Sequence, residues 1–148
     1  MTPATKLALT AAAIMAGLFA VPSARAEGVP DLKGTWTLDG SSFAAARVGS
    51  ENKYFGDLPK PTFGKPDQAF TFVIDEQDGR AFHGHAVGPN GKKEIVVGVI
   101  RFDDASLLMS GDSGIVDGRI VGDKVELCWI DALDKWNAVS CGLYGKSK

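Results

Sequence analysis

Short apolar runs broken by Gly, Asp, Asn and Pro fill most of the chain after residue 33. In 69–75, Phe70, Phe72 and Ile74 occupy every second position, which is the period of a half-buried strand. Asp78-Gly79 and Asn90-Gly91 are dipeptides that tolerate the positive φ of tight turns. The pattern predicts eight strands without a long amphipathic helix, over 34–38, 69–75, 80–87, 94–102, 106–110, 115–121, 125–130 and 137–144.

Regularly spaced short strands with tight turns are typical of an all-β antiparallel meander. An eight-stranded up-and-down barrel is the predicted fold, because closure leaves no unpaired strand edge. A sandwich of two sheets is the alternative that the pattern leaves open. The interior of an eight-stranded barrel is filled by side chains or holds one small ligand.

The segment 49–68 interrupts this rhythm with Pro59, Pro61 and Pro66. It also contains the aromatic residues Tyr54, Phe55 and Phe63. Connections of this length are usually functional or disordered, and aromatic side chains argue against disorder. We therefore expect a loop that either closes one end of the barrel as a lid or covers the surface.

The first 26 residues have the pattern of a secretory signal peptide. Lys6 precedes an uncharged apolar run over 7–21, and Ala24-Arg25-Ala26 places small residues at a cleavage site. The run is shorter than the roughly 20 apolar residues that cross a bilayer, although an uncleaved membrane helix is the alternative. Cleavage would leave a single domain over 27–148 in the periplasm or the medium.

The charge of the predicted mature chain excludes two classes of partner. Without Lys6 and Arg25 it has 14 basic and 18 acidic side chains, a net charge of −4. Such a chain has no electrostatic footprint for nucleic acid or for anionic lipid. No second apolar run is long enough for a membrane helix, so we expect no membrane association after cleavage.

Both cysteines, Cys128 and Cys141, lie in the predicted mature domain. An even pair in an oxidising compartment favours a disulfide over two buried free thiols, which is the alternative. A hairpin symmetric about Asp134 and Lys135 would place the two cysteines directly opposite each other. Opposed residues have Cβ atoms ~4.5–5.5 Å apart and a disulfide needs ~3.5–4.5 Å, so the bridge is feasible.

The stretch GTWTLDGSSF, which begins with Gly34-Thr35-Trp36, resembles the first strand and turn of avidins. Avidins and lipocalins belong to the calycin superfamily, and the resemblance implies a barrel with Trp36 closing one end. Leu38 and Ala86 stand near positions where avidins contact biotin through polar or Tyr side chains. The avidin Trp cage is not reproduced either, so the resemblance does not extend to biotin binding.

We predict five ligand-binding residues, which are Tyr54, Phe55, Phe63, Trp129 and Arg101. Trp129 alternates with apolar residues in 125–129 and is expected to be buried near a barrel end. Arg101 either orients a ligand carboxylate through its planar guanidinium or lies along the surface at a strand end.

Trp136 falls in the predicted turn of the last hairpin, which places it at the surface. His83 and His85 share one strand face, but Phe82 on the other face should point to the core. Both histidines are therefore expected to face solvent, and we predict no metal site and no cofactor.

No nucleophile elbow and no phosphate-binding glycine loop occur in the chain, so no catalytic residue is predicted. The expected function is binding of an apolar or amphipathic small molecule in the barrel mouth. A periplasmic interaction or inhibitor domain that acts through its loops is the alternative, and an enzyme is the third.

Overall fold

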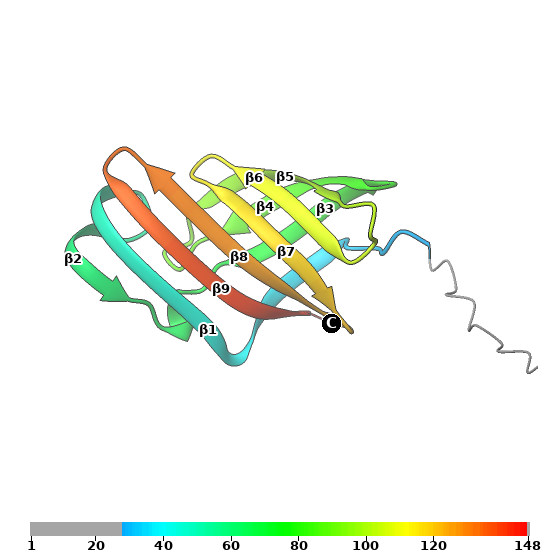
Figure 1. Cartoon of the computed structure of the whole chain (residues 1–148), viewed down its shortest axis with the longest axis horizontal. Helices are drawn as coiled ribbons and strands as arrows, with labels where there is room; N and C mark the ends of the chain where they lie inside the picture. The colour runs from blue at the N-terminus through cyan, green and yellow to red at the C-terminus, as the bar shows by residue number, and fades with distance from the viewer. Residues whose placement is uncertain (1–27, 148) are drawn as a thin grey trace, which may run out of the picture.

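The computed structural model describes residues 28–147, and the predicted signal peptide lies outside the described residues. Nine strands and a short 3-10 helix make up this part of the chain (Figure 1). They are β1 (Gly34–Asn52), β2 (Gly56–Phe63), η1 (Pro66–Gln68), β3 (Thr71–Asp78), β4 (Ala81–Val87), β5 (Lys93–Ile100), β6 (Ser106–Gly111), β7 (Ile115–Val121), β8 (Lys124–Leu133) and β9 (Trp136–Lys146). No helix among residues 28–147 is long and apolar enough to cross a membrane.

The strands form a closed antiparallel barrel. From β3 to β9 each strand pairs with the next one along the chain, and β1 pairs with both β3 and β9. In Figure 1 the strands β1, β9, β8 and β7 run in front of β3, β4 and β5. The prediction of an eight-stranded all-β barrel is confirmed, and β2 is an additional strand on the far half of β1.

The first strand is much longer than the sequence pattern predicts. Leu38 pairs with Tyr144 and Phe43 pairs with Gly142, so the four residues between Leu38 and Phe43 bulge out of the ladder. Gly40 provides the positive φ of 59° inside this bulge. Ending the strand at Leu38 was wrong because β9 pairs with β1 on both sides of the bulge.

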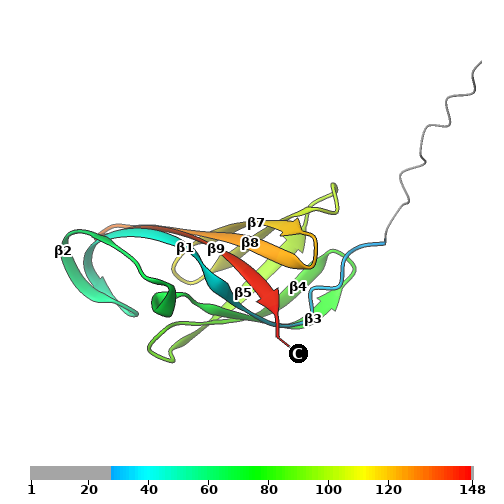
Figure 2. The ribbon, with the colours of Figure 1, turned by 90° about the horizontal axis from the view of Figure 1, so that it is seen from below.

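The segment expected to be a loop contains a strand. We call Gly49 to Phe63 the flap: it comprises the end of β1, a turn over 53–55, and β2. The two strands pair antiparallel with register shifts at Gly49, and Figure 2 shows this hairpin at one end of the barrel. Pro59 and Pro61 fit an edge strand, where a missing N–H does not interrupt a sheet.

The opposite end of the barrel is filled by side chains. Trp36 is buried there, and its indole N–H donates to the Leu32 carbonyl oxygen at 2.8 Å. Gln77 holds the segment before β1 in place, since it accepts from the Leu32 N–H and donates to the Pro30 carbonyl oxygen, both at 2.8 Å. The void among the apolar side chains here measures about 20 Å³, so this end has no room for a ligand.

Alternation along the strands decides which side chains enter the core. Phe82 and Ala86 are buried, whereas His83 is exposed and His85 is half-buried on the outer face, as predicted. The core cluster continues around the barrel with Leu32, Trp36, Phe72, Ile74, Val96, Ile100, Leu107, Met109, Val116, Val125, Leu127, Trp129 and Tyr144.

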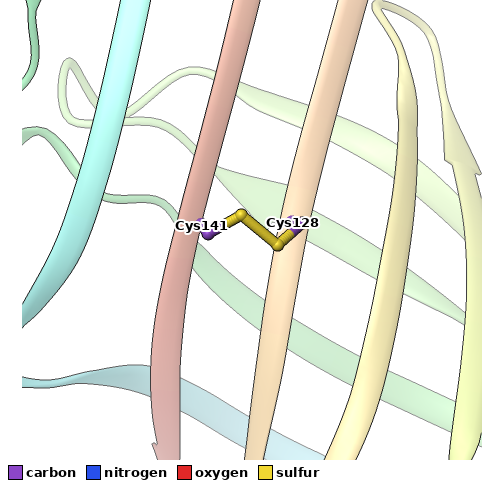
Figure 3. The surroundings of a disulfide bond; sticks show 2 residues. All are labelled: Cys128 and Cys141. Carbon is purple, nitrogen blue, oxygen red and sulfur yellow. A yellow bond between two sulfur atoms is a disulfide. The ribbon is translucent and has the colours of Figure 1, made fainter.

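Cys128 and Cys141 form the predicted disulfide (Figure 3). They are directly opposed on β8 and β9, and their Cα atoms are 4.0 Å apart. Both residues lie between positions that point into the barrel, so the bridge joins the two strands on the outer face.

Candidate functional site

The tip of the flap, residues 53–55, enters the barrel mouth. The Asn52 side-chain oxygen accepts the backbone N–H groups of Tyr54 and Phe55 at 2.9 and 3.1 Å, which fixes the turn. Asn90, in the turn between β4 and β5, donates from Nδ2 to the Lys53 carbonyl oxygen at 3.0 Å. The tip is thereby held against the barrel, and the Tyr54 side chain is buried.

A buried carboxylate anchors this tip. The Glu94 side chain has an exposed fraction of 0 %, and its Oε2 atom accepts the Tyr54 hydroxyl at 2.5 Å. The same oxygen lies 2.7 Å from Lys53 Nζ and 2.9 Å from the Ser113 hydroxyl, which also donates to Oε1 at 3.2 Å. Burial, followed by the hydrogen bond to Glu94, raises the pKa of Tyr54, which therefore stays a neutral donor.

Two further buried polar groups at this end have no partner atom. Asp131 is 5 % exposed, and its Oδ1 atom has no hydrogen bond. Trp136 is 2 % exposed, and its indole N–H also has no acceptor. Such groups are uncommon in native proteins because an unpaired buried polar atom costs about 1–3 kcal/mol.

The surroundings of Asp131 disfavour its charged form. Desolvation, and then the negative charge of Glu94, raises the pKa of Asp131 to about 6, while the positive charge of Lys53 acts in the opposite direction. Asp131 therefore changes its protonation state between acidic and neutral pH.

Arg47 of β1 is a buried cation at this end, with an exposed fraction of 5 %. Its guanidinium lies 4.0 Å from the centre of the Phe55 ring, and Nη1 donates to the Gln68 side-chain oxygen at 2.9 Å. Burial lowers the pKa of Arg47, because the buried guanidinium has lost part of its hydration.

Stacked aromatic rings form the walls of this end. Phe55 stacks on Trp136 with ring centres 6.1 Å apart, and Phe70 stacks on Trp129 at 5.5 Å. They surround a void of about 20 Å³, which we call the flap-end site. It is lined by Arg47, Asn52, Tyr54, Phe55, Phe70, Ser113, Trp129, Asp131, Trp136, Ala138 and Ser140.

An open hollow of about 380 Å³ lies beside the flap-end site. Asn52, Ser113 and Trp136 line both spaces, so they form the wall between the hollow and the void. The volume is within the usual range of small-molecule sites, which is roughly 300–1,000 Å³. A ligand in the hollow could thus reach Asp131 with a small polar group if this wall moved.

Three of the five predicted ligand-binding residues, Tyr54, Phe55 and Trp129, meet at the flap-end site. Phe63 lies elsewhere, at the end of β2, where it is 81 % exposed. Arg101 also lies elsewhere: it follows β5 on the outer surface and pairs with Asp117 at 3.2 Å. Its position reflects the alternation of β5, in which 95, 97 and 99 point outward and 94, 96 and 100 are buried.

Sequence reasoning missed Arg47, Glu94, Asp131 and Trp136. The prediction that Trp136 is a surface residue was wrong, because β9 begins at this residue and directs its ring inward against Phe55. Alternation gives a usable signal for Asp131, which continues the buried series 125, 127, 129.

The histidines of β4 form hydrogen bonds with carboxylates on the outer face. His83 Nε2 lies 3.1 Å from Glu76 and His85 Nδ1 lies 2.9 Å from Asp75. Within residues 28–147, no three His, Cys, Asp or Glu side chains are grouped so that they could hold a metal ion.

Replacing Asp131 with asparagine should stabilise the protein at pH 7 by up to about 3 kcal/mol, because a pKa raised by burial means that ionisation opposes folding. Between the unfolded pKa near 4 and the folded pKa near 6, the wild-type folded state binds more protons, so its stability falls as the pH rises. Urea unfolding at pH 4 and pH 7 should show the advantage of Asp131→Asn only at pH 7. An equal effect at both pH values would contradict this account.

Comparisons of the chain with protein-family models, with curated proteins and with solved structures found no match. The fold therefore rests on the strand pairing described above, and the resemblance to calycins rests on Gly34-Thr35-Trp36 within a closed eight-stranded barrel.

Proposed function

We propose that this protein is an exported, calycin-like barrel that binds a small molecule at the flap-end site. The ligand would lie with its larger part in the hollow and would place a polar group beneath the flap. Its apolar portion would contact the ring of Trp136 and the side chain of Leu133, which both line the hollow. The cross-strand disulfide fits an exported protein, since such bonds persist in oxidising compartments.

The unpartnered Asp131 and Trp136 carry this proposal. Both line one void, and one supplies a hydrogen-bond acceptor while the other supplies a donor. Apolar side chains at these positions would make the barrel more stable, and the Trp36 end is lined by such side chains. Polar groups that are buried without partners at one end, beside a hollow of ligand size, are typical of a binding site.

The first test is native mass spectrometry of the mature protein purified from the compartment to which its host exports it, followed by identification of any released molecule. A thermal-shift screen of the ligand-free protein should use amines, carboxylates, amino acids, sugars and fatty acids. We expect a reproducible adduct or shift, and quenching of Trp fluorescence on binding because two of the three Trp residues line the site.

Two variants test the location of binding. Trp136→Phe removes the indole N–H and keeps an aromatic ring, so it should weaken binding about tenfold, the effect of one lost buried hydrogen bond. Arg101→Gln is the matched control on the outer surface and should bind like the wild type. Absence of every adduct and shift would contradict the proposed function.

A protein-interaction role is the second candidate, because two large aromatic side chains are exposed. Phe63 on β2 is 81 % exposed, and Phe102 after β5 is 91 % exposed. Aromatic side chains are enriched in protein–protein interfaces. Capture of a partner that Phe63→Ser or Phe102→Ser abolishes, together with an empty ligand screen, would favour this role.

A further inference from the structure

We propose that the ligand of the flap-end site is a small zwitterion, with an ammonium group and a carboxylate close together as in a free amino acid. This inference rests on the proposed binding function. It follows from the arrangement of charges across three neighbouring strands.

Arg47, Ala138 and Asp131 form one cross-strand row. Ala138 of β9 pairs with Arg47 of β1 on one side and with Asp131 of β8 on the other. Two strand spacings of ~4.8 Å place the backbones of the charged residues about 10 Å apart. The small Ala138 side chain leaves the space between them open, and all three residues line the void.

The opposite charges of this row do not neutralise each other. Among the described residues, the ion pairs include none between Arg47 and Asp131, and Asp131 Oδ1 has no hydrogen bond. Buried charges are strongly destabilising unless they are paired. A zwitterion between them would pair both, with its ammonium on Asp131 and its carboxylate towards Arg47.

The remaining polar groups of the site also favour a ligand that carries both an ammonium group and a carboxylate. The Trp136 indole N–H is a free donor for a carboxylate oxygen. Glu94 is already paired with Lys53 at 2.7 Å. This pair has no net charge, so it attracts neither a simple cation nor a simple anion. With Arg47 and Asp131 of opposite sign, the site as a whole favours a ligand without net charge that carries both signs.

Entry requires movement of the flap tip. A zwitterionic head group is larger than the void of about 20 Å³, so Tyr54 and Phe55 must shift outward. Gly49 and Gly56 border the moving part, and their φ values of 134° and 67° are conformations that glycine adopts without strain. The ligand side chain would then occupy the hollow, against Leu133.

The test is isothermal titration calorimetry of the mature protein with the free L-amino acids. The best binder is compared with its N-acetyl derivative, which lacks the ammonium, and with its carboxamide, which lacks the carboxylate. Each derivative should bind about 10- to 100-fold more weakly, because a buried hydrogen bond to a charged group is lost.

Variants assign the two halves of the ligand. Asp131→Asn should weaken binding of the amino acid about 10- to 100-fold and change the affinity for its N-acetyl derivative little. Arg47→Gln should likewise weaken binding of the amino acid about 10- to 100-fold and change the affinity for its carboxamide little. Arg101→Gln should leave all affinities unchanged. Circular dichroism of each variant shows whether the barrel has folded. The comparison of the amino acid with its two derivatives uses wild-type protein, so it does not depend on the folding of any variant.

Two results would overturn the inference without touching the proposed function. One is that no amino acid binds while the thermal-shift screen identifies a ligand of another class. The other is that the N-acetyl derivative and the carboxamide bind as tightly as the parent zwitterion. An empty screen across all classes would instead contradict the proposed function itself.

Discussion

Replacing Trp36 with alanine is expected to lower the free energy of unfolding by about 3–5 kcal/mol, the usual loss for a large aromatic core residue. The indole is 7 % exposed and packs in the cluster that fills the barrel opposite the flap. Its loss would also leave the Leu32 carbonyl oxygen without the N–H donor that now lies 2.8 Å away. Urea unfolding, followed by far-ultraviolet circular dichroism, measures the change.

Trp36→Phe separates the two contributions. Trp36→Phe keeps a ring in the core and removes only the hydrogen bond and part of the side-chain volume. Its free energy of unfolding should therefore fall much less than that of Trp36→Ala. Ligand binding at the flap end should survive in folded Trp36→Phe, because Trp36 does not line that site. A loss under about 1 kcal/mol for Trp36→Ala would show that Trp36 is not a core residue.

The order and approximate positions of the strands from β3 to β9 could be predicted because residues that favour turns separate them along the chain. Asp78-Gly79 and Gly122-Asp123 join strands at turns where Gly79 and Gly122 have positive φ. Apolar alternation in β3 and β8 placed Phe72 and Trp129 in the core, and both are buried. Hairpin symmetry about Asp134 and Lys135 likewise predicted that Cys128 lies opposite Cys141, because the register of a hairpin follows from the number of residues on each side of its turn.

The strand β2 and the buried positions of Arg47 and Glu94 could not be predicted because they depend on contacts between distant segments. Asp39-Gly40 has the composition of a turn, yet pairing with β9 continues β1 past it. Prolines in β2 argue against a strand, but an edge position tolerates them. In β5 both faces are apolar, so alternation alone did not show that Glu94 shares the buried face.

The two ends of the barrel differ in what covers them. The segment before β1 covers the Trp36 end with apolar packing and the Gln77 hydrogen bonds. The flap covers the other end through the aromatic contacts of Tyr54 and Phe55 and through the pairing of Lys53 and Tyr54 with Glu94. The hollow of about 380 Å³ lies beside the flap, whereas the void at the Trp36 end measures only about 20 Å³, and this difference favours the flap end as the entrance.

Removing the disulfide is expected to lower the free energy of unfolding by about 3 kcal/mol, from the chain entropy that closing a short loop removes. The bridge joins residues separated by 13 positions, and it lies within the β8–β9 hairpin that carries both Asp131 and Trp136. Cys128→Ser with Cys141→Ser should therefore fold with a lower urea midpoint. Binding should persist wherever the variant is folded, since the bridge lies on the outer face.

The single variants distinguish the bridge from the packing of its sulfur atoms. Cys128→Ser alone already abolishes the bond, so adding Cys141→Ser should cause little further loss. Dithiothreitol should lower the stability of the wild type to that of the double variant and leave the double variant unchanged. A double variant that loses about twice as much as each single variant would assign the effect to side-chain packing. The hairpin would then be held by its ladder alone, and Asp131 and Trp136 would owe their positions to strand pairing rather than to the covalent bond.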